Sequence, residues 1–476
     1  MQTKPVYLNG RHIRSAESFE VINPSTGDSL ARMSSIGREE VGKAITDAHE
    51  AWKGWRRLTA LERGDLLLSI AEAMTARFDE LAETITRENG KPLAQSKSEV
   101  SGSIDHFRWF AEEGRRAYGR VIPNQSIGNR HMVLKVPVGV VAAITPWNFP
   151  LILAARKVAP ALAAGCPVIL RPASQTPLSS VILSECVGKA GLPPGVFQLI
   201  AGPAQPIASE LMANPLCRKV SFTGSTKIGR ELIHGSADTV TNLSLELGGL
   251  APVLIFDDAD LDQAVEGSLI AKFRNTGQSC IAANRILVQK GIYNSFIDRF
   301  CRRIGELKVG DGFEPGVDIG PLVNQEAFES ATTHIEDALA RGAKLLCGGN
   351  RKGEGNGFFL EPTVLGKVPD SALCTQEETF APIAPVGSFD TEEEAITQAN
   401  SSEFGLASYV FTKDINRALR LMEEIEAGMI GINDSVLSTS QAPFGGVKQS
   451  GMGRELGIEG LDAFLETKHI SIGGLA

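Results

Sequence analysis

At 476 residues, the chain is too long for one ordinary hydrophobic core and suggests two or three domains. Hydrophobic residues make up 43% and charged residues 22%, as in an ordinary globular protein. The formal net charge of -9, with lysines and arginines dispersed among acidic residues, disfavours nucleic-acid binding and leaves small-molecule chemistry as the expected function.

The seven cysteines and seven histidines are scattered along the chain. No CxxC pair or HExxH spacing occurs, so we expect neither a disulfide framework nor a catalytic metal. Residues 1–10 lack the apolar core of a signal peptide, and the apolar stretch 151–170 is interrupted by Arg156, Lys157 and two prolines. We therefore expect a cytoplasmic protein without a membrane span.

The first part of the chain is predicted to be helical. After an extended lead-in that ends in a turn at 23–27, apolar residues recur at three- and four-residue spacing, which is typical of amphipathic helices. The predicted helices run over about 38–57, 61–76, 78–89 and 93–117. Together they predict a helical layer.

From about Met132 the pattern changes to short apolar runs separated by helical stretches. The strand candidates are 138–144, 167–170, 196–200 and 220–222, with helices such as 151–164 and 178–191 between them. Near-continuous apolar strands that alternate with helices predict a parallel sheet covered on both faces. Ligands of such sheets bind at the carboxyl ends of the strands.

A second α/β block follows from Leu247. Its predicted strands and helices lie at 252–256, 261–276, 285–289 and 293–307, with further units to about Met429. The tail contains two glycine-rich turns, at 443–448 and 450–455, and ends in an alternating strand at 468–472. An exposed terminal strand favours pairing with another subunit, so we expect a homo-oligomer.

Two loops after predicted strands suit ligand binding. Small residues in Thr223–Gly229 permit the amides of a helix N-terminus to approach a pyrophosphate, although a simple glycine turn explains the pattern equally well. In Thr145–Pro150, two prolines fix the backbone around Trp147 and Asn148. A rigid Asn148 amide suits the stabilisation of a developing oxyanion, which a plain strand-to-helix turn does not require.

Two further positions carry reactive groups. Glu246 lies in an apolar run, where a carboxylate is either paired or has a raised pKa suited to a general base; an exposed glutamate at a domain junction is the alternative. Cys280 follows the polar run 274–279. We expect a reachable nucleophile in a place that tolerates negative charge, against the alternative of a small buried side chain.

The order and spacing of these motifs resemble the aldehyde dehydrogenase superfamily over essentially the whole chain. The motifs that carry the resemblance are Pro146-Trp147-Asn148-Phe149-Pro150, Phe222-Thr223-Gly224-Ser225, Leu245-Glu246-Leu247-Gly248-Gly249, Gly277-Gln278-Ser279-Cys280, Glu377-Glu378-Thr379-Phe380 and Pro443-Phe444-Gly445-Gly446. The resemblance implies an α/β subunit in three parts, assembled as a dimer or tetramer. These parts are a noncontiguous Rossmann-like NAD(P)-binding domain (1–117 and 139–246), a catalytic domain (247–440) and a β oligomerisation arm (118–138 and 460–476).

The resemblance also implies catalytic roles. Cys280 matches the nucleophile that forms a thiohemiacetal, and Asn148 with the Cys280 amide matches the oxyanion site. Glu246 matches the base that activates water to hydrolyse the thioester, while Lys157 and Glu455 match a proton relay. Covalent capture makes physical sense because it turns an aldehyde, a poor hydride donor, into a tetrahedral alkoxide that releases hydride readily.

The same match implies a dinucleotide site, in which Glu378 and Phe380 hold the nicotinamide ribose and ring. The other cofactor candidates are Ile144, Thr145, Pro146, Trp147, Arg171, Ala173, Ser174, Phe222, Thr223, Gly224, Ser225, Ile228, Leu247 and Gly248. Where many members carry Lys-Pro-x-Glu, this chain has Arg171-Pro172-Ala173-Ser174. Loss of that carboxylate and gain of a guanidinium predict that NADP is accepted, and leave open whether it is preferred to NAD.

Three residues, Arg156, Arg274 and Ser438, match the carboxylate clamp of succinate-semialdehyde dehydrogenases, and Phe444 is a further substrate-binding candidate. Two guanidiniums that converge on a short pocket require an anionic substrate, whereas an arginine in a structural salt bridge does not. Ala282 stands where some relatives have a second cysteine, so no local disulfide switch is expected.

The resulting prediction is an NAD(P)-dependent dehydrogenase that oxidises succinate semialdehyde to succinate. The alternatives are a dehydrogenase for glutarate, 2-oxoglutarate or another anionic semialdehyde, a CoA-acylating relative, and a non-catalytic structural homologue. The presence of Cys280, Glu246 and Asn148 disfavours the structural homologue, and Glu246 disfavours the CoA-acylating relative.

Overall fold

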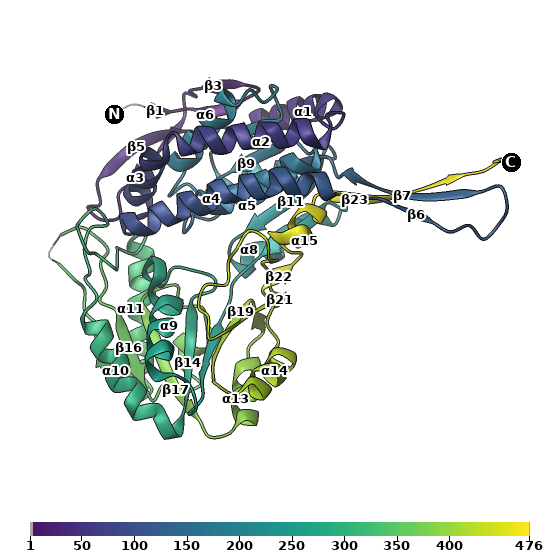
Figure 1. The fold of residues 1–476 in the computed structure, drawn as a ribbon. Helices are drawn as coiled ribbons and strands as arrows, with labels where there is room; N and C mark the ends of the chain where they lie inside the picture. The colour runs from purple at the N-terminus through teal and green to yellow at the C-terminus, as the bar shows by residue number, and fades with distance from the viewer. Residues whose placement is uncertain (1–2, 354, 476) are drawn as a thin grey trace.

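The computed structural model describes residues 3–353 and 355–475. Two large sheets, each flanked by helices, form the body of the molecule, and a narrow three-stranded arm projects from it (Figure 1). None of the helices in these residues is long and apolar enough to cross a membrane. The α/β class expected from the sequence is therefore confirmed.

The predicted helical layer forms close to its expected bounds. Its helices are α1 (Arg38–Trp55), α2 (Ala60–Thr75), α3 (Phe78–Asn89) and α4 (Leu93–Glu113). Helix α2 begins with a capping box, in which Thr59 accepts a hydrogen bond from the Glu62 amide while Glu62 accepts one from the Thr59 amide. The expected last turn of α4 tightens into a 3₁₀ helix over Gly114–Arg116.

An eight-stranded sheet has the order β22-β12-β11-β8-β9-β10-β2-β3. Its strands are β2 (Val6–Leu8), β3 (Arg11–Ile13), β8 (Val140–Ile144), β9 (Val168–Arg171), β10 (Phe197–Leu199), β11 (Cys217–Thr223), β12 (Asn242–Glu246) and β22 (Gly451–Met452). The strands from β8 to β12 are parallel, and every residue of β8 is buried. The apolar runs of the sequence thus form a doubly covered sheet.

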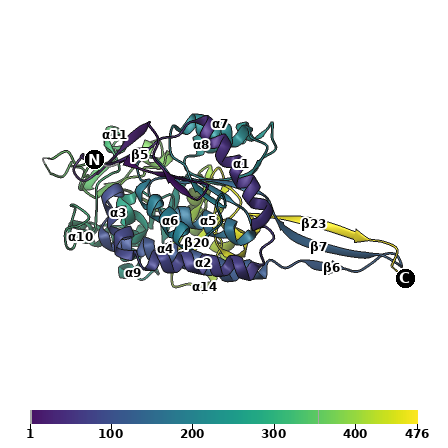
Figure 2. The ribbon, with the colours of Figure 1, turned by 90° about the horizontal axis from the view of Figure 1, so that it is seen from above.

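Two helical layers cover this sheet (Figure 2). Helices α5 (Ile152–Ala164) and α6 (Leu178–Lys189) lie on one face, between the sheet and helices α2, α3 and α4. Helices α1, α7 (Ala204–Ala213) and α8 (Thr226–Ser236) lie on the other. The chain order reverses between the adjacent strands β8 and β11, so a crevice for a ligand is expected at their carboxyl ends.

A seven-stranded sheet has the order β15-β16-β17-β14-β13-β19-β20. Its strands are β13 (Ala251–Ile255), β14 (Ala283–Gln289), β15 (Lys344–Cys347), β16 (Thr363–Gly366), β17 (Ile383–Phe389), β19 (Ala407–Phe411) and β20 (Met429–Ile432). All neighbours except the β15 and β16 pair are parallel. Its helices are α9 (Leu261–Phe273), α10 (Tyr293–Gly305), α11 (Gln325–Ala340), α12 (Leu373–Gln376), α13 (Glu392–Asn400) and α14 (Ile415–Glu424).

The two large sheets are joined by a short link. Strand β12 ends at Glu246 and β13 begins at Ala251, so the chain leaves the carboxyl end of one sheet and enters the amino end of the other. Gly249 permits a close approach here, because a Cβ atom on it would lie 2.5 Å from the Cys280 carbonyl oxygen. The backbone at Cys280 therefore lies against the link that follows β12.

Smaller elements complete the body. The lead-in, expected only to be extended, contributes β2 and β3 to the eight-stranded sheet and forms a separate sheet from β1 (Thr3–Lys4), β4 (Ser18–Ile22) and β5 (Ser29–Ser34). Strand β18 (Phe404–Gly405) pairs with β21 (Val447–Lys448), and α15 (Gly457–Asp462) precedes the last strand. Through β22, the tail pairs beside β12, next to Glu246.

The arm consists of β6 (Arg120–Ile122), β7 (Arg130–Pro137) and β23 (Leu465–Ile472) in the order β23-β7-β6. It extends well beyond the body, and the C-terminus lies at its tip (Figure 2). Apolar side chains on it, including Val121 and Ile127, are exposed. Its strands thus carry both unpaired edges and apolar surface.

Candidate functional site

The segment before Cys280 has a strained backbone. Asn275, Thr276 and Gly277 have φ values of 50°, 59° and 74°, in the left-handed region that only glycine adopts readily. Side-chain hydrogen bonds hold the turn: Asn275 Nδ2 donates to the Gln278 carbonyl (3.1 Å) and Thr276 Oγ1 to the Gly320 carbonyl (3.1 Å). Left-handed non-glycine residues of this kind are typical of functional sites that the surrounding structure fixes.

Cys280 is partly exposed and lines a small cavity of about 60 Å³. Burial of the sulfur, together with the nearby carboxyl groups of Glu378 and Glu246, raises the pKa of the Cys280 thiol to about 12. The side chain is thus reachable, as expected. Burial is the largest cause of this raised pKa, and the Arg156 guanidinium opposes the two carboxyl groups. A place that tolerates negative charge on the sulfur stays a prediction.

Three buried groups next to this cavity form a charged cluster. Glu246, at the end of β12, is 3% exposed, and Lys157 in α5 is fully buried and forms an ion pair with Glu455. Burial first, and then the Glu455 carboxylate, raise the pKa of Glu246 well above its ordinary value. A Cβ atom on Gly445 would lie 2.6 Å from Glu246 Oε1, so only glycine fits there. Glu246 therefore has the raised pKa anticipated for a general base.

Asn148 lies in the turn between β8 and α5 and is 3% exposed. Its Nδ2 donates a hydrogen bond to the Gln278 carbonyl (3.1 Å), so its amide group is joined to the turn that precedes Cys280. It also lines the same cavity as Cys280. Asn148 and Cys280, which lie far apart in the sequence, thus line the same cavity.

Two arginine side chains bring positive charge to this cavity. Arg156 and Arg274 both line it, together with Ser438 and Phe444. Arg156 Nη2 donates to Ser438 Oγ (2.9 Å), and its guanidinium lies 4.2 Å from the centroid of the Phe444 ring. All four predicted substrate residues are therefore brought together around one space.

The two arginines differ in their partners. Arg156 Nε lies 3.8 Å from Glu455 Oε2, so a structural ion pair accounts for part of its burial. Arg274 packs its guanidinium over Phe149 at 5.4 Å, and within residues 3–353 and 355–475 no carboxylate lies within 4.0 Å of it. Burial lowers the pKa of Arg274, and the more distant Glu99 carboxylate offsets this only in part.

The carboxyl ends of β8, β9 and β11 fit a polar ligand. Each presents a buried polar atom with no hydrogen-bond partner among the described residues: Thr145 Oγ1, Arg171 Nε and Thr223 Oγ1. Buried polar groups are normally paired, so three such atoms along one crevice indicate a missing partner. Ser225 caps the neighbouring helix α8 by accepting from the Ile228 amide, and the amides of the first turn of α8 border the crevice.

Most of the remaining cofactor candidates lie close to the strand ends of the eight-stranded sheet, whereas Glu378 and Phe380 precede β17 of the seven-stranded sheet. Glu378 accepts a long hydrogen bond from the Gly249 amide (3.4 Å), and burial raises its pKa to about 8. Phe380 (φ 44°) packs edge-on against Trp147, with ring centroids 5.4 Å apart. The positions of the others in the chain are Ile144 and Phe222 in strands, Pro146, Ala173, Ser174, Gly224, Leu247 and Gly248 in the links, and Ile228 in α8.

Some residues of the site carried no usable sequence signal. Tyr409, in the buried strand β19, lines the cavity and donates a hydrogen bond from its hydroxyl to the Ile281 carbonyl (2.8 Å). Ser435 also lines it, and its Oγ is buried without a partner among the described residues. In the sequence, a tyrosine in an apolar run indicates a core residue. It comes close to the nucleophile only because β19 pairs with β13.

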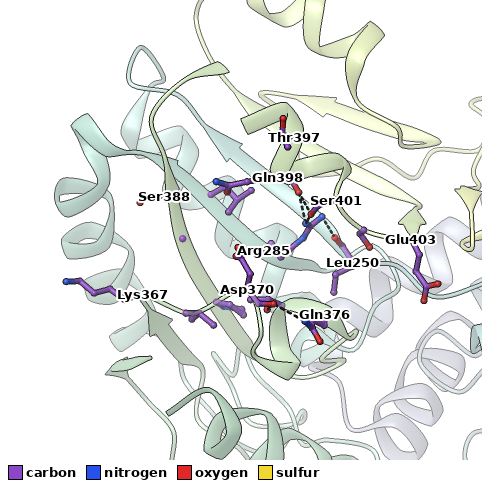
Figure 3. Close-up of a pocket in the computed structure, with 16 residues that line it drawn as sticks. Leu250, Arg285, Lys367, Asp370, Gln376, Ser388, Thr397, Gln398, Ser401 and Glu403 are labelled. Atoms are coloured by element: carbon purple, nitrogen blue, oxygen red, sulfur yellow. Dashed lines mark hydrogen bonds between the residues drawn. The ribbon is translucent and has the colours of Figure 1, made fainter. Parts of the chain in front are cut away.

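A larger cavity, of about 860 Å³, lies elsewhere, over β14 and β17 beside α13 (Figure 3). None of the predicted site residues lines it. Its buried Arg285 donates to the carbonyls of Gln398, Ala399 and Leu250, two of which end α13. Arg285 is thus a cap for a helix C-terminus, a structural role in which the helix dipole offsets its charge.

Comparisons with known proteins cover nearly the whole chain. The sequence model of the Aldehyde dehydrogenase family matches residues 12–470. A 3-sulfolactaldehyde dehydrogenase of Pseudomonas putida is 49% identical over 461 residues, which cover 97% of this chain and 95% of that protein. The succinate-semialdehyde dehydrogenase [NADP(+)] GabD of Escherichia coli (strain K12) is 47% identical over 468 residues, covering 98% and 97%. A solved structure described as an E. coli NADP dependent enzyme has a TM-score of 0.98 at 46% identity, covering 99% and 98% of the two chains.

Proposed function

Because this chain belongs to the aldehyde dehydrogenase family, we propose that it oxidises a short aldehyde with a distal anionic group, with succinate semialdehyde as the leading substrate. The observation that carries this proposal is the shared cavity of Cys280, Asn148 and two arginines, one of which lacks an ion-pair partner among the described residues. An uncharged aldehyde would leave Arg274 desolvated and unpaired, whereas an anionic group satisfies it.

The reaction begins with the sulfur of Cys280. Its Sγ bonds to the aldehyde carbon, the thiol proton leaves, and the carbonyl oxygen becomes an oxyanion that accepts hydrogen bonds from Asn148 Nδ2 and the Cys280 amide. Since the pKa of the thiol is about 12, its proton leaves as the carbon–sulfur bond forms rather than beforehand. Lys157 and Glu455 then carry the proton onward.

The cofactor crevice would hold NAD(P) through the ends of β8, β9 and β11 and through Glu378. A bound NAD(P)⁺ would supply the hydride acceptor for the carbon attached to Cys280, and loss of that hydride would leave a thioester. Arg171 lies at the end of β9 without a carboxylate within 4.0 Å among the described residues, and Ser174 follows it in the loop, so the site tolerates a 2′-phosphate. NADP and NAD are both proposed as acceptors.

Hydrolysis of the thioester completes the reaction. Glu246 accepts a proton from a water molecule, the water oxygen bonds to the acyl carbon, and the carbon–sulfur bond breaks to release the acid and the Cys280 thiolate. The ion pair of Lys157 and Glu455 lies close enough to Glu246 to affect its pKa, so we assign the onward transfer of this proton to it. Each atom and proton is thereby assigned to a group that lies in the cluster.

A sulfonated aldehyde is the second candidate, because the relative named for 3-sulfolactaldehyde is 49% identical to this chain. Glutarate and 2-oxoglutarate semialdehydes are longer alternatives. The test is a steady-state panel of these aldehydes and butanal with NAD and with NADP. We expect the highest kcat/KM for succinate semialdehyde and at least tenfold less for butanal. Equal values for butanal and the anionic aldehydes would exclude the proposal.

We further propose three domains and a homo-oligomer. The eight-stranded sheet would belong to the cofactor domain (1–117 and 139–246), the seven-stranded sheet to the catalytic domain (247–440), and the arm to an oligomerisation element (118–138 and 460–476). The exposed edges and apolar residues of the arm support this assignment. Light scattering of the chain and of a Val121→Lys/Leu134→Lys variant tests it, since added charge on the arm should shift the mass toward the monomer.

A further inference from the structure

Residues of the helical layer form hydrogen bonds with the turn that carries Asn148. Lys91 lies between α3 and α4 and is 1% exposed. Its Nζ donates hydrogen bonds to the Asn148 carbonyl oxygen (2.7 Å) and to Glu99 Oε2 (2.6 Å). The ammonium also lies 4.0 Å from the centroid of the Phe149 ring. One lysine therefore contacts the backbone of Asn148 and the ring that follows it.

The partner of Lys91 holds the other end of the same turn. Glu99, in α4, is 1% exposed, and its Oε1 accepts hydrogen bonds from the amides of Leu151 (2.9 Å) and Ile152 (3.3 Å). These amides begin helix α5, where a carboxylate is favoured by the unpaired N–H groups and by the helix dipole. The ion pair thus fixes both the Asn148 carbonyl and the start of α5.

The same carbonyl is tied to the nucleophile. Asn275 Nδ2 donates to the Asn148 carbonyl oxygen (2.8 Å) and to the Gln278 carbonyl (3.1 Å), and Asn148 Nδ2 donates to the Gln278 carbonyl as well. A shift of the Asn148 backbone would therefore move its amide relative to the strained turn before Cys280. Lys91 opposes such a shift from the side of the helical layer.

We propose that Lys91 and Glu99 are positioning residues for catalysis: their buried ion pair holds the Asn148 backbone so that its amide faces the oxyanion formed on Cys280. The inference rests on the proposed function. A buried ion pair is seldom the most stable choice for a core, since two apolar side chains of similar size are often at least as stable. Apolar residues could not supply the three hydrogen bonds that this pair makes with the Asn148 carbonyl and with the amides that begin α5.

A second glutamate of the helical layer provides a matched control. Glu88, in α3, is 1% exposed, and its carboxylate accepts hydrogen bonds from the amides of Leu178 (2.6 Å) and Ser179 (3.0 Å) at the start of α6. It caps a sheet helix as Glu99 does. No hydrogen bond between Glu88 and Asn148 occurs in the described residues, so removal of its charge should affect stability alone.

The test is the rate of reduced-cofactor formation in the first turnover. The variant Lys91→Met/Glu99→Gln removes both charges of the pair together: the new amide group would still accept hydrogen bonds from the amides that begin α5, whereas the new thioether could not donate one to Asn148. We expect a 10- to 100-fold lower first-turnover rate, a Kd for NADP within twofold of the unmodified chain, and no further loss when the changes are added to Asn148→Ala. Glu88→Gln should lower Tm by a comparable amount and keep the rate.

Three outcomes would overturn the inference. If the losses from Lys91→Met/Glu99→Gln and from Asn148→Ala multiply, the pair acts independently of Asn148. If Asn148→Ala is slow but the double variant keeps the full rate, the pair has no role in positioning while the proposed function stands. If Asn148→Ala itself keeps the full rate, the oxyanion step of the proposed function fails, and the inference with it. Should the double variant not fold, Lys91→Arg, which keeps the charge but moves the donor, enters the same comparison.

Discussion

The two large sheets present opposite ends to the candidate site. The eight-stranded sheet contributes the carboxyl ends of β8, β9, β11 and β12, followed by the cofactor candidates and Glu246. The seven-stranded sheet contributes the amino ends of β13, β14 and β17, which Gly249, Cys280 and Phe380 precede. The usual placement of ligands at carboxyl ends describes only the first sheet.

This difference follows from the connection between the sheets. Because β12 runs into β13 through 247–250, the carboxyl end of one sheet faces the amino end of the other. The first half therefore offers the N-terminus of α8 to an anionic cofactor, whereas the second offers a strained turn with a cysteine at its end. Cofactor binding and covalent chemistry should accordingly be separable by mutation.

The largest expected effect is loss of turnover without loss of cofactor binding. Replacing Cys280 with alanine removes the only group proposed to bond to the aldehyde, so turnover should fall by on the order of 10⁴-fold or more. The Kd for NADP, measured by fluorescence titration, should change less than twofold. Sustained turnover at a normal rate would end the covalent mechanism.

A smaller loss of turnover is expected when Glu246, at the link between the two large sheets, is replaced. Glu246→Gln should lower steady-state turnover by roughly 10²- to 10⁴-fold, as for loss of a general base, yet keep a first-turnover burst of reduced cofactor. Stopped-flow absorbance measures both quantities. A burst that disappears along with steady-state turnover would place Glu246 in the first step alone.

The pH profile of the same residue sharpens this assignment. Burial and Glu455 raise the pKa of Glu246, so its carboxyl group holds a proton to higher pH and gains the base form only as pH rises. Deacylation should therefore become faster with increasing pH through that pKa, and the Glu246→Gln variant should lack this rise. Single-turnover hydrolysis of the acylated protein across pH 5–9 measures it.

Replacing each of the two arginines proposed to bind the substrate anion should have a different effect on kcat/KM. Removing one partner of a buried charged contact costs about 2–4 kcal/mol, or roughly 30- to 10³-fold in kcat/KM. Arg274→Ala should lose this on succinate semialdehyde and little on butanal, because no carboxylate lies within 4.0 Å of Arg274 among the described residues. Arg156→Ala should slow both aldehydes, since Arg156 also adjoins Glu455. Equal losses on the two aldehydes in the Arg274 variant would remove the clamp.

The smallest effect is expected within the cofactor half. Ser174→Glu introduces a carboxylate beside the proposed 2′-phosphate position, so kcat/KM for NADP should fall roughly tenfold while that for NAD stays within threefold. Steady-state kinetics with each dinucleotide give the ratio, with Ser174→Ala as the control. An unchanged ratio would place the adenosine ribose away from Ser174.

Local patterns predicted much of the fold. Helix α3 has the expected bounds of 78–89, because three- and four-residue apolar spacing depends only on neighbouring turns of the same helix. The sequence predicts the lead-in only as extended, although β1, β4 and β5 form a sheet there and β2 joins the eight-stranded sheet where Tyr7 pairs with the distant Leu199. Strand pairing of that kind depends on distant partners, which a local pattern does not contain.

The sequence by itself determined the alternation of strands and helices, the motifs at the strand ends and the family, because these depend on residue type and order. Tertiary structure decided which ends of the two sheets meet, that burial and then acidic neighbours raise the pKa of Cys280, and that Lys91 reaches Asn148 across 57 positions. Those outcomes depend on distances and burial, which arise only when separate parts of the chain pack together.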